Sequence, residues 1–134
     1  TGATFTLAES QGKPLYVENF ATWCSNCRQQ LGNVQTAAKA SGQQATFVAL
    51  SVETDLSADK VAAYAKDQGF DNIRFAVMTP EVLSAMQATY GTSALNPPST
   101  PHFYVNADGQ AGPLATGFED AARIQSALTD AGRN

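Results

Sequence analysis

The sequence contains few of the residues that build metal centres or nucleic-acid surfaces. Its 134 residues include only two cysteines, one histidine and one tryptophan. The 8 lysines and arginines are scattered along the chain and are outnumbered by 12 aspartates and glutamates, so the formal net charge is −4. Because an extended phosphate-binding face needs clustered cations, we do not expect nucleic acid as a partner.

Long hydrophobic runs are also missing. No apolar run approaches the roughly 18 residues that a membrane-spanning helix needs, and residues 1–4 lack the basic-then-apolar pattern of a signal peptide. The chain has no internal repeat and no low-complexity stretch. With 43% hydrophobic residues, a chain of this length is expected to form a single domain, residues 1–134, that buries its own core.

Both cysteines lie in one tetrapeptide, residues 24–27, which reads Cys-Ser-Asn-Cys. The preceding residues 14–21 are rich in β-formers, and the following residues 28–38 carry a helical spacing of apolar positions. The pattern therefore predicts that a strand ends and a helix begins around the tetrapeptide. We expect Cys24 in the exposed first turn of this helix and Cys27 one turn further along.

A dithiol at the start of a helix is suited to redox chemistry. The free N–H groups of a helix N-terminus stabilise an anion, so the pKa of Cys24 is expected to fall to roughly 3.5–7.5. The three-residue offset places Cys27 on the same helical face, where its thiol can attack a mixed disulfide. We predict Cys24 as the nucleophile and Cys27 as the resolving thiol, acting without a bound cofactor.

Two other interpretations of the cysteines remain open. Cys24, Cys27 and the single histidine, His102, are three soft or borderline ligands, which could hold copper(I) or zinc for delivery. A zinc site would need a carboxylate or water as its fourth ligand. A purely structural disulfide is the other alternative, although a bond across so short a loop removes little unfolded-state entropy.

In the rest of the chain, the turn residues and the spacing of apolar residues between them predict alternating strands and helices. Strands are expected over residues 4–7, 14–21, 45–52 and 73–77, and a hairpin over residues 102–105 and 112–118 around the turn 106–109. Helices are expected over residues 24–40, 57–69, 80–91 and 119–131. Inward positions are expected at Val61, Tyr64, Ala65, Val82, Leu83, Met86, Tyr90, Ile124 and Leu128. Parallel units followed by an antiparallel hairpin predict an α/β fold, a central mixed β-sheet flanked by helices on both faces.

The segment 20–28, Phe-Ala-Thr-Trp-Cys-Ser-Asn-Cys-Arg, resembles the active-site junction of the thioredoxin fold. Together with Tyr90-Gly91, the helix around residues 57–68 and the Thr-Pro before the hairpin, it is similar to the TlpA/ResA-like thiol:disulfide oxidoreductases. The resemblance implies a thioredoxin-like fold and a periplasmic or cell-envelope enzyme, often membrane-anchored in its precursor. It further implies a reductant of client-protein cysteines, including those of apocytochromes, which acts as a monomer and is served by an upstream, membrane-bound redox partner.

The chain departs from this family at two places near the dithiol. Family members often carry Glu three positions after the second cysteine and Pro two positions later, and here these positions hold Gln30 and Gly32. The loop between Tyr90 and Pro101 is also longer than the family's. These departures weaken the case for a cytochrome-maturation client.

Two other classes of protein with this fold fit the sequence less well. Copper chaperones of this fold usually separate their cysteines by three residues, and related peroxidases carry a Pro and Thr pattern that is absent here.

Glu18 is the acid that this resemblance singles out. It falls on the position of thioredoxin's buried aspartate, and Ala49 falls on the position of that aspartate's lysine partner. Burial without a cation should raise the pKa of Glu18, so that it can exchange a proton with Cys27 as a general acid–base. The alternative is a register slip that points Glu18 at solvent.

The resemblance also implies a client-binding surface. Pro101 corresponds to a cis-proline that faces the dithiol, and the backbone of Thr100 would pair with a client peptide as an added strand. Pro97 and Pro98 compete for the same assignment. Trp23 is expected to cover the disulfide and to contact clients. His102 either faces Cys24 or is a structural residue.

Overall fold

The computed structural model describes residues 12–132. It contains four strands, β1 (Leu15–Phe20), β2 (Thr46–Ser51), β3 (Arg74–Val77) and β4 (His102–Val105). The four α-helices are α1 (Ser25–Ser41), α2 (Ala58–Gln68), α3 (Pro80–Tyr90) and α4 (Ala121–Gly132), and two short 3₁₀ helices are η2 (Thr92–Leu95) and η3 (Pro97–Ser99). The strand predicted over residues 4–7 lies outside the described residues. No helix between residues 12 and 132 is long and apolar enough to cross a bilayer.

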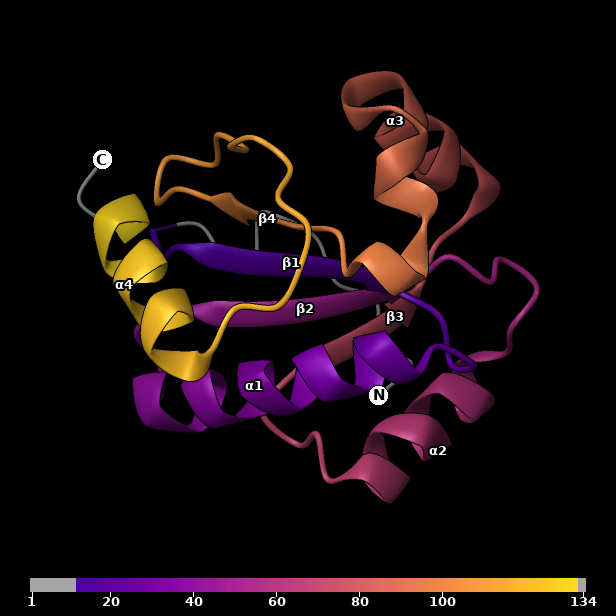
Figure 1. Cartoon of the computed structure of the whole chain (residues 1–134), viewed down its shortest axis with the longest axis horizontal. Helices are drawn as coiled ribbons and strands as arrows, with labels where there is room; N and C mark the ends of the chain where they lie inside the picture. Colours follow the sequence, from indigo (N-terminus) through magenta and orange to yellow (C-terminus); the bar gives the residue numbers. More distant parts are fainter. Residues whose placement is uncertain (1–11, 133–134) are drawn as a thin grey trace.

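The strands form one mixed sheet in the order β3-β2-β1-β4 (Figure 1). β1 pairs in parallel with β2, β2 in parallel with β3, and β4 runs antiparallel to β1. Helices flank this sheet, so the predicted thioredoxin-like α/β architecture is confirmed. β1 lies between β2 and β4, and its carboxyl end leads directly to the cysteine tetrapeptide.

The predicted second arm of the hairpin, residues 112–118, is not a strand in the described structure. Residues 111–118 instead pair with β4 through two isolated bridges, His102 with Ala115 and Val105 with Ala111, and the Gly112 N–H donates to the Tyr104 carbonyl at 2.8 Å. Pro113 lies between these two bridges. Because proline lacks the N–H that a ladder needs, it interrupts continuous pairing here.

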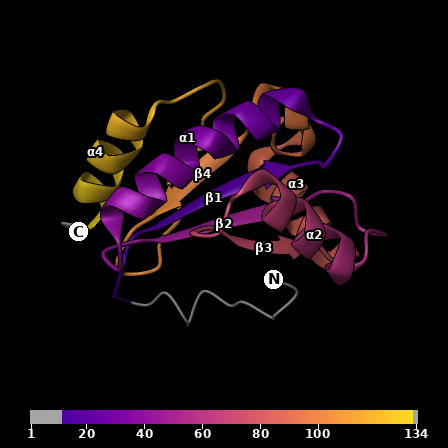
Figure 2. The ribbon, with the colours of Figure 1, turned by 90° about the horizontal axis from the view of Figure 1, so that it is seen from below.

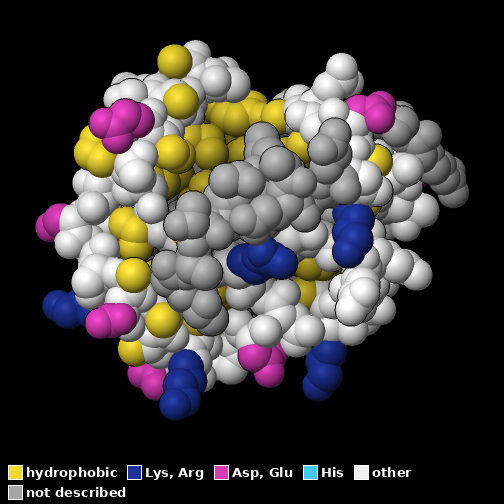
Figure 3. Space-filling view, turned by 180° about the vertical axis from the view of Figure 1, so that it is seen from behind, with side chains coloured by type: hydrophobic (Ala, Val, Ile, Leu, Met, Phe, Trp, Pro, Cys, Tyr) yellow, Lys and Arg dark blue, Asp and Glu magenta, His cyan; other side chains and the backbone are white. Residues whose placement is uncertain are grey.

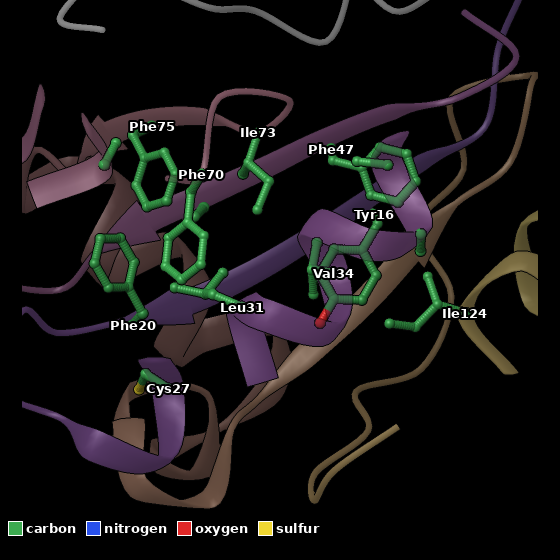
Figure 4. Close-up of a cluster of buried hydrophobic side chains, with 14 of the residues drawn as sticks. Tyr16, Phe20, Cys27, Leu31, Val34, Phe47, Phe70, Ile73, Phe75 and Ile124 are labelled. Atoms are coloured by element: carbon green, nitrogen blue, oxygen red, sulfur yellow. The ribbon is translucent and has the colours of Figure 1, made fainter. Parts of the chain in front are cut away.

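The two faces of the sheet carry separate apolar clusters. Tyr16 and Phe20 of β1 belong to the larger cluster, which α1, α2 and α4 cover (Figures 2 and 4). Cys27 lies at the edge of this cluster. The alternate β1 residues Leu15 and Val17 belong to a smaller cluster on the other face. Strand alternation thus places every second β1 side chain beneath the cysteine helix.

The smaller cluster is covered in part by the carboxyl half of α3. Met86 and Tyr90 pack against it, whereas Val82, one turn earlier, has 39% of its surface exposed. Val82 thus faces the sheet side as expected, where it borders an apolar groove, but it is not buried there. Val17 and Phe103 line an apolar groove on this side of the molecule, and apolar side chains gather there in Figure 3.

Side-chain caps fix the starts of α2 and α3. The Ser57 hydroxyl accepts the Lys60 N–H at 3.2 Å at the start of α2, and Gly69 ends that helix in the left-handed region with φ 77°. Thr79 caps α3 in the same way through the Val82 N–H. Such caps stabilise the otherwise unpaired N–H groups of the first turn.

Two matched valine truncations test this account of the helices. Val61→Ala, at a fully buried position in α2, should lower the free energy of unfolding by about 2 kcal/mol more than Val82→Ala in α3. The gain in helix propensity from Val to Ala is common to both variants, so the difference reports burial. Urea denaturation followed by circular dichroism measures it. Equal effects would contradict the assigned burial.

Candidate active site

The cysteine tetrapeptide lies where β1 turns into α1. The Cys24 N–H donates to the Ala21 carbonyl at 3.1 Å, which closes the turn after β1. Cys24 is the N-cap of α1, and its Sγ accepts the Cys27 N–H at 3.1 Å. The two cysteines form a disulfide with their Cα atoms 5.3 Å apart, within the usual range. The predicted strand-to-helix position of the dithiol is confirmed.

Cys24 is less accessible than expected. Only 2% of its surface is exposed, because as the N-cap it folds its sulfur back toward the first turn of α1. The neighbouring Trp23 is 64% exposed, and Ser25 and Asn26 are exposed as well. The prediction of an exposed Cys24 is therefore wrong. The accessible surface around the disulfide belongs to Trp23 before it and to the two residues between the cysteines.

The two sulfur atoms have different surroundings. Cys24 Sγ receives a backbone N–H at the positive end of a helix, an arrangement that stabilises a thiolate. Cys27 Sγ lies 3.1 Å from the carbonyl oxygen of Pro97, which would repel a thiolate and accept a hydrogen bond from a thiol. After reduction, the negative charge is thus favoured on Cys24 and the proton on Cys27.

The loop opposite the dithiol approaches it through its first two prolines. Pro97 contacts Cys27, and the Pro98 carbonyl accepts a hydrogen bond from the Asn26 side chain at 2.9 Å. Pro101 lies deeper, where its carbonyl accepts the Asn19 N–H at 3.1 Å. Pro97 and Pro98 therefore supply the carbonyl groups that contact the tetrapeptide.

Thr100 is buried, and both of its backbone polar groups are engaged. Its N–H donates to the Pro97 carbonyl, and its carbonyl faces His102 Nδ1, each at 2.8 Å. No peptide bond within residues 12–132 is cis, so the expectation of a cis-Pro101 is wrong for this structure. Thr100 instead takes left-handed angles, φ 50° and ψ 56°, which reverse the chain between η3 and β4.

Glu18 is fully buried, on the face of β1 that α1 covers. Its Oε1 accepts the Tyr16 hydroxyl at 2.7 Å, whereas Oε2 has no hydrogen-bond partner among the described residues. Burial raises the pKa of Glu18 from 4.5 to about 8, and the Tyr16 hydrogen bond opposes this shift. Ala49 lies opposite Glu18 on β2, so the predicted burial beside a neutral neighbour is confirmed.

His102 is fully buried in β4, in register with Glu18. Its Nδ1 contacts the Thr100 carbonyl, and its Nε2 lies 2.6 Å from Glu119 Oε1. Of the two predicted roles, the structure therefore favours the structural one. The described residues 12–132 hold no group of three or more histidine, cysteine or acidic side chains placed to bind a metal.

The sequence analysis missed Glu53, which holds the turn ahead of Cys24. Glu53 Oε1 accepts the Thr22 N–H at 2.6 Å, and Oε2 accepts the Thr22 hydroxyl at 3.0 Å. Ser51 adds a third hydrogen bond to Oε1. Glu53 follows a parallel strand 31 residues from Thr22, so no local sequence pattern could have indicated the contact.

Comparison with protein families gives one match. The family model described as Redoxin matches residues 1–117. A search of curated protein sequences finds no match.

Solved structures with the same fold include several bacterial thiol-disulfide proteins. A thioredoxin-family thiol:disulfide interchange protein from Chlorobium tepidum is 25% identical, with a TM-score of 0.79, covering 95% of this chain and 85% of that one. The exposed lipoprotein thioredoxin Etrx1 of Streptococcus pneumoniae is 21% identical, with a TM-score of 0.74 and coverages of 96% and 92%. A secreted disulfide oxidoreductase of Mycobacterium tuberculosis is 16% identical, with a TM-score of 0.67 and coverages of 94% and 87%.

The raised pKa of Glu18 makes folding stability depend on pH. Between pH 4.5 and about 8 the folded state retains a proton on Glu18 that the unfolded state releases, so stability falls as pH rises through this window. We expect Glu18→Gln to remove this fall. Urea unfolding at pH 5 and pH 8 measures it, with the exposed Glu81→Gln as the matched control. The same pH dependence in wild type and Glu18→Gln would contradict the assignment.

Proposed function

Because the chain belongs to the Redoxin family, we propose that its Cys24–Cys27 pair exchanges a disulfide with cysteines of client proteins. Family membership and the thioredoxin-like fold identify the chain as a thiol-disulfide oxidoreductase. The observation that carries the proposal is the asymmetry of the two sulfurs. Cys24 accepts a helix N–H, and Cys27 faces the Pro97 carbonyl, so the pair divides naturally into a nucleophile and a resolving thiol.

The proposed reaction reduces a client disulfide. The Cys24 thiolate attacks one client sulfur, a bond forms between them, and the other client sulfur leaves as a thiolate that takes up a proton. Cys27 then gives its proton to a base and attacks Cys24 Sγ. The mixed disulfide breaks, the second client sulfur leaves and is protonated, and the enzyme is left with the Cys24–Cys27 disulfide. Two electrons pass to the client, and an upstream dithiol must restore the enzyme.

We propose Glu18 as the base for the second step. Glu18 lies on the face of β1 that α1 covers, and Cys27 lies at the edge of the apolar cluster on that same face. This shared location supports the role. A pKa of about 8 leaves both protonation states populated near neutral pH, which suits a group that both accepts and returns a proton. In the reverse reaction, the same carboxyl would protonate Cys27 as it leaves.

The proposed client surface combines Trp23 with the loop that begins at Pro97. Trp23 is exposed beside the disulfide, and Pro98 is exposed next to Asn26. Thr100 and Pro101 belong to the same loop, and because they are buried we propose that they shape it from beneath. A client strand that pairs with the Thr100 backbone would first have to displace its present partners.

We place the enzyme in the cell envelope as a monomeric reductant, served by a membrane-bound redox partner. Support comes from similar structures described as an exposed lipoprotein and as a secreted oxidoreductase. Apocytochrome cysteines are one proposed class of client, suggested by the TlpA/ResA-like junction at residues 20–28. Neither cofactor nor nucleic acid enters the proposed reaction.

Trapping of the mixed disulfide tests the roles of the two cysteines. Cys27→Ser should accumulate a covalent adduct with a disulfide-bonded peptide, because nothing resolves the bond at Cys24. Cys24→Ser should accumulate at least about tenfold less, because the remaining thiol is buried and faces a carbonyl. Mass spectrometry under non-reducing conditions measures both adducts. Equal trapping would contradict the assigned roles, and no adduct from either variant would contradict the function.

The reduction potential tests the direction of electron flow. Equilibration in dithiothreitol and glutathione buffers, followed through emission of the single tryptophan, Trp23, should give a value nearer to about −270 mV than to about −120 mV. Trp23→Phe with mass detection of the redox state is the control for the optical signal. A potential at the oxidising end would mark the protein as a disulfide donor and refute the proposed direction.

A further inference from the structure

The buried His102 and the partly exposed Glu119 connect the client-facing loop to the dithiol helix. On the basis of the proposed function, we propose that these two residues position the loop 96–101 against the amino end of α1, and thereby set the rate of exchange with polypeptide clients. Neither side chain forms a hydrogen bond with the disulfide. Their role would be exerted through Thr100 on one side and Gln30 on the other.

The orientation of the His102 ring is fixed on several sides. It stacks on Tyr16 with the ring centroids 5.4 Å apart and the planes at 23°, and it meets Tyr104 edge-on at 6.1 Å. The Thr100 carbonyl can only accept, so Nδ1 carries the proton in their 2.8 Å hydrogen bond. Nε2 is thereby directed at Glu119 Oε1, 2.6 Å away, and the hydrogen bond there requires a second proton between these two atoms.

Glu119 is itself held by two further elements. Its Oε1 also accepts the Tyr104 hydroxyl at 2.8 Å, from β4. Its backbone N–H donates to Gln30 Oε1 at 3.0 Å, and Gln30 is buried on α1 three residues after Cys27. The loop is therefore tied to α1 by two routes, directly at Pro97 and indirectly through His102, Glu119 and Gln30.

The side chain of Gln30 both accepts and donates a hydrogen bond, as an amide can. Its oxygen accepts the Glu119 N–H, while its nitrogen lies 3.5 Å from the Tyr16 hydroxyl as a donor. Tyr16 in turn donates to Glu18. An ionised glutamate at this position would have no hydrogen to donate to the Tyr16 hydroxyl. It would also add a third carboxyl group to the network that holds Glu18 and Glu119. Gln30 is one of the residues that distinguish this chain from the TlpA/ResA-like family, and it fits the hydrogen-bond network to which His102 belongs.

The contact with Thr100 is the one that would transmit the effect to clients. Thr100 has left-handed backbone angles, and its carbonyl is buried. Losing the His102 donor would leave that carbonyl unpaired, which favours a shift of the loop. A shift on the order of 1 Å in a positioning element can change a rate by up to about a hundredfold. The Pro97 and Pro98 carbonyls would move with it, since they lie within the same short loop.

Two substitutions of His102 separate its nitrogens. Asparagine places an amide nitrogen where Nδ1 lies and can keep the bond to Thr100, whereas glutamine reaches the place of Nε2 and keeps only the contact with Glu119. The readout is a ratio of two second-order rate constants for the reduced enzyme. One is measured with a disulfide-cyclised peptide, and the other with oxidised glutathione, which is too small to span the loop.

We expect His102→Gln to lower the peptide-to-glutathione ratio by about tenfold, and His102→Asn to restore most of it. Glu119→Ala removes the side chain that holds the His102 ring toward Thr100, so it should lower the ratio in the same direction by a smaller factor, and because Glu119 is partly exposed this variant serves if His102→Gln does not fold. The exposed Glu81→Ala in α3 is the matched control and should leave the ratio unchanged.

The outcomes distinguish the two proposals. Equal losses with peptide and glutathione, an unchanged ratio in His102→Gln or Glu119→Ala, or failure of His102→Asn to restore the ratio would overturn the positioning role. A wild-type enzyme that exchanges with neither substrate would instead overturn the proposed function.

Discussion

The hydrogen bond from the Cys27 N–H to Cys24 Sγ is the contact on which the chemistry of this site depends. It exists because β1 ends just before the tetrapeptide and α1 begins at Ser25, which makes a cysteine the N-cap. An N-cap normally accepts through oxygen, and a sulfur there gains the same stabilisation of negative charge. The rest of the site, including Glu53 behind the turn and Pro97 in front of it, holds this geometry in place.

The position of β1 between β2 and β4 turns one short strand into the organiser of the buried polar groups. Alternation sends Tyr16 and Glu18 to the face covered by α1, and the antiparallel register sets His102 opposite Glu18. Unpaired polar groups in such an interior are costly, and hydrogen bonds join Tyr16 to Glu18 and both His102 and Tyr104 to Glu119, while Glu18 Oε2 is left without a partner among the described residues. The pKa values of Glu18, Tyr16 and Tyr104 are all raised chiefly by this burial.

Most of the fold followed from local signals in the sequence. The helix over residues 57–69 and the strand before the tetrapeptide were both predicted and are confirmed. Predicted burial and exposure failed at two positions where helical spacing alone had to decide them. Val82 fits the spacing but borders an open groove and stays 39% exposed, and Cys24 is hidden because its sulfur turns back toward its own helix.

The sequence by itself determined the class of the site, because the spacing of two cysteines and the punctuation of strand and helix are local properties. The resemblance to the thioredoxin junction placed Glu18 beneath the helix, and the structure has this register and not the slip that would point Glu18 at solvent. Only the tertiary structure decided which proline approaches the dithiol and which partners His102 has. Those depend on contacts between segments far apart in the chain, such as Gln30 with Glu119, and no short-range pattern encodes their distances.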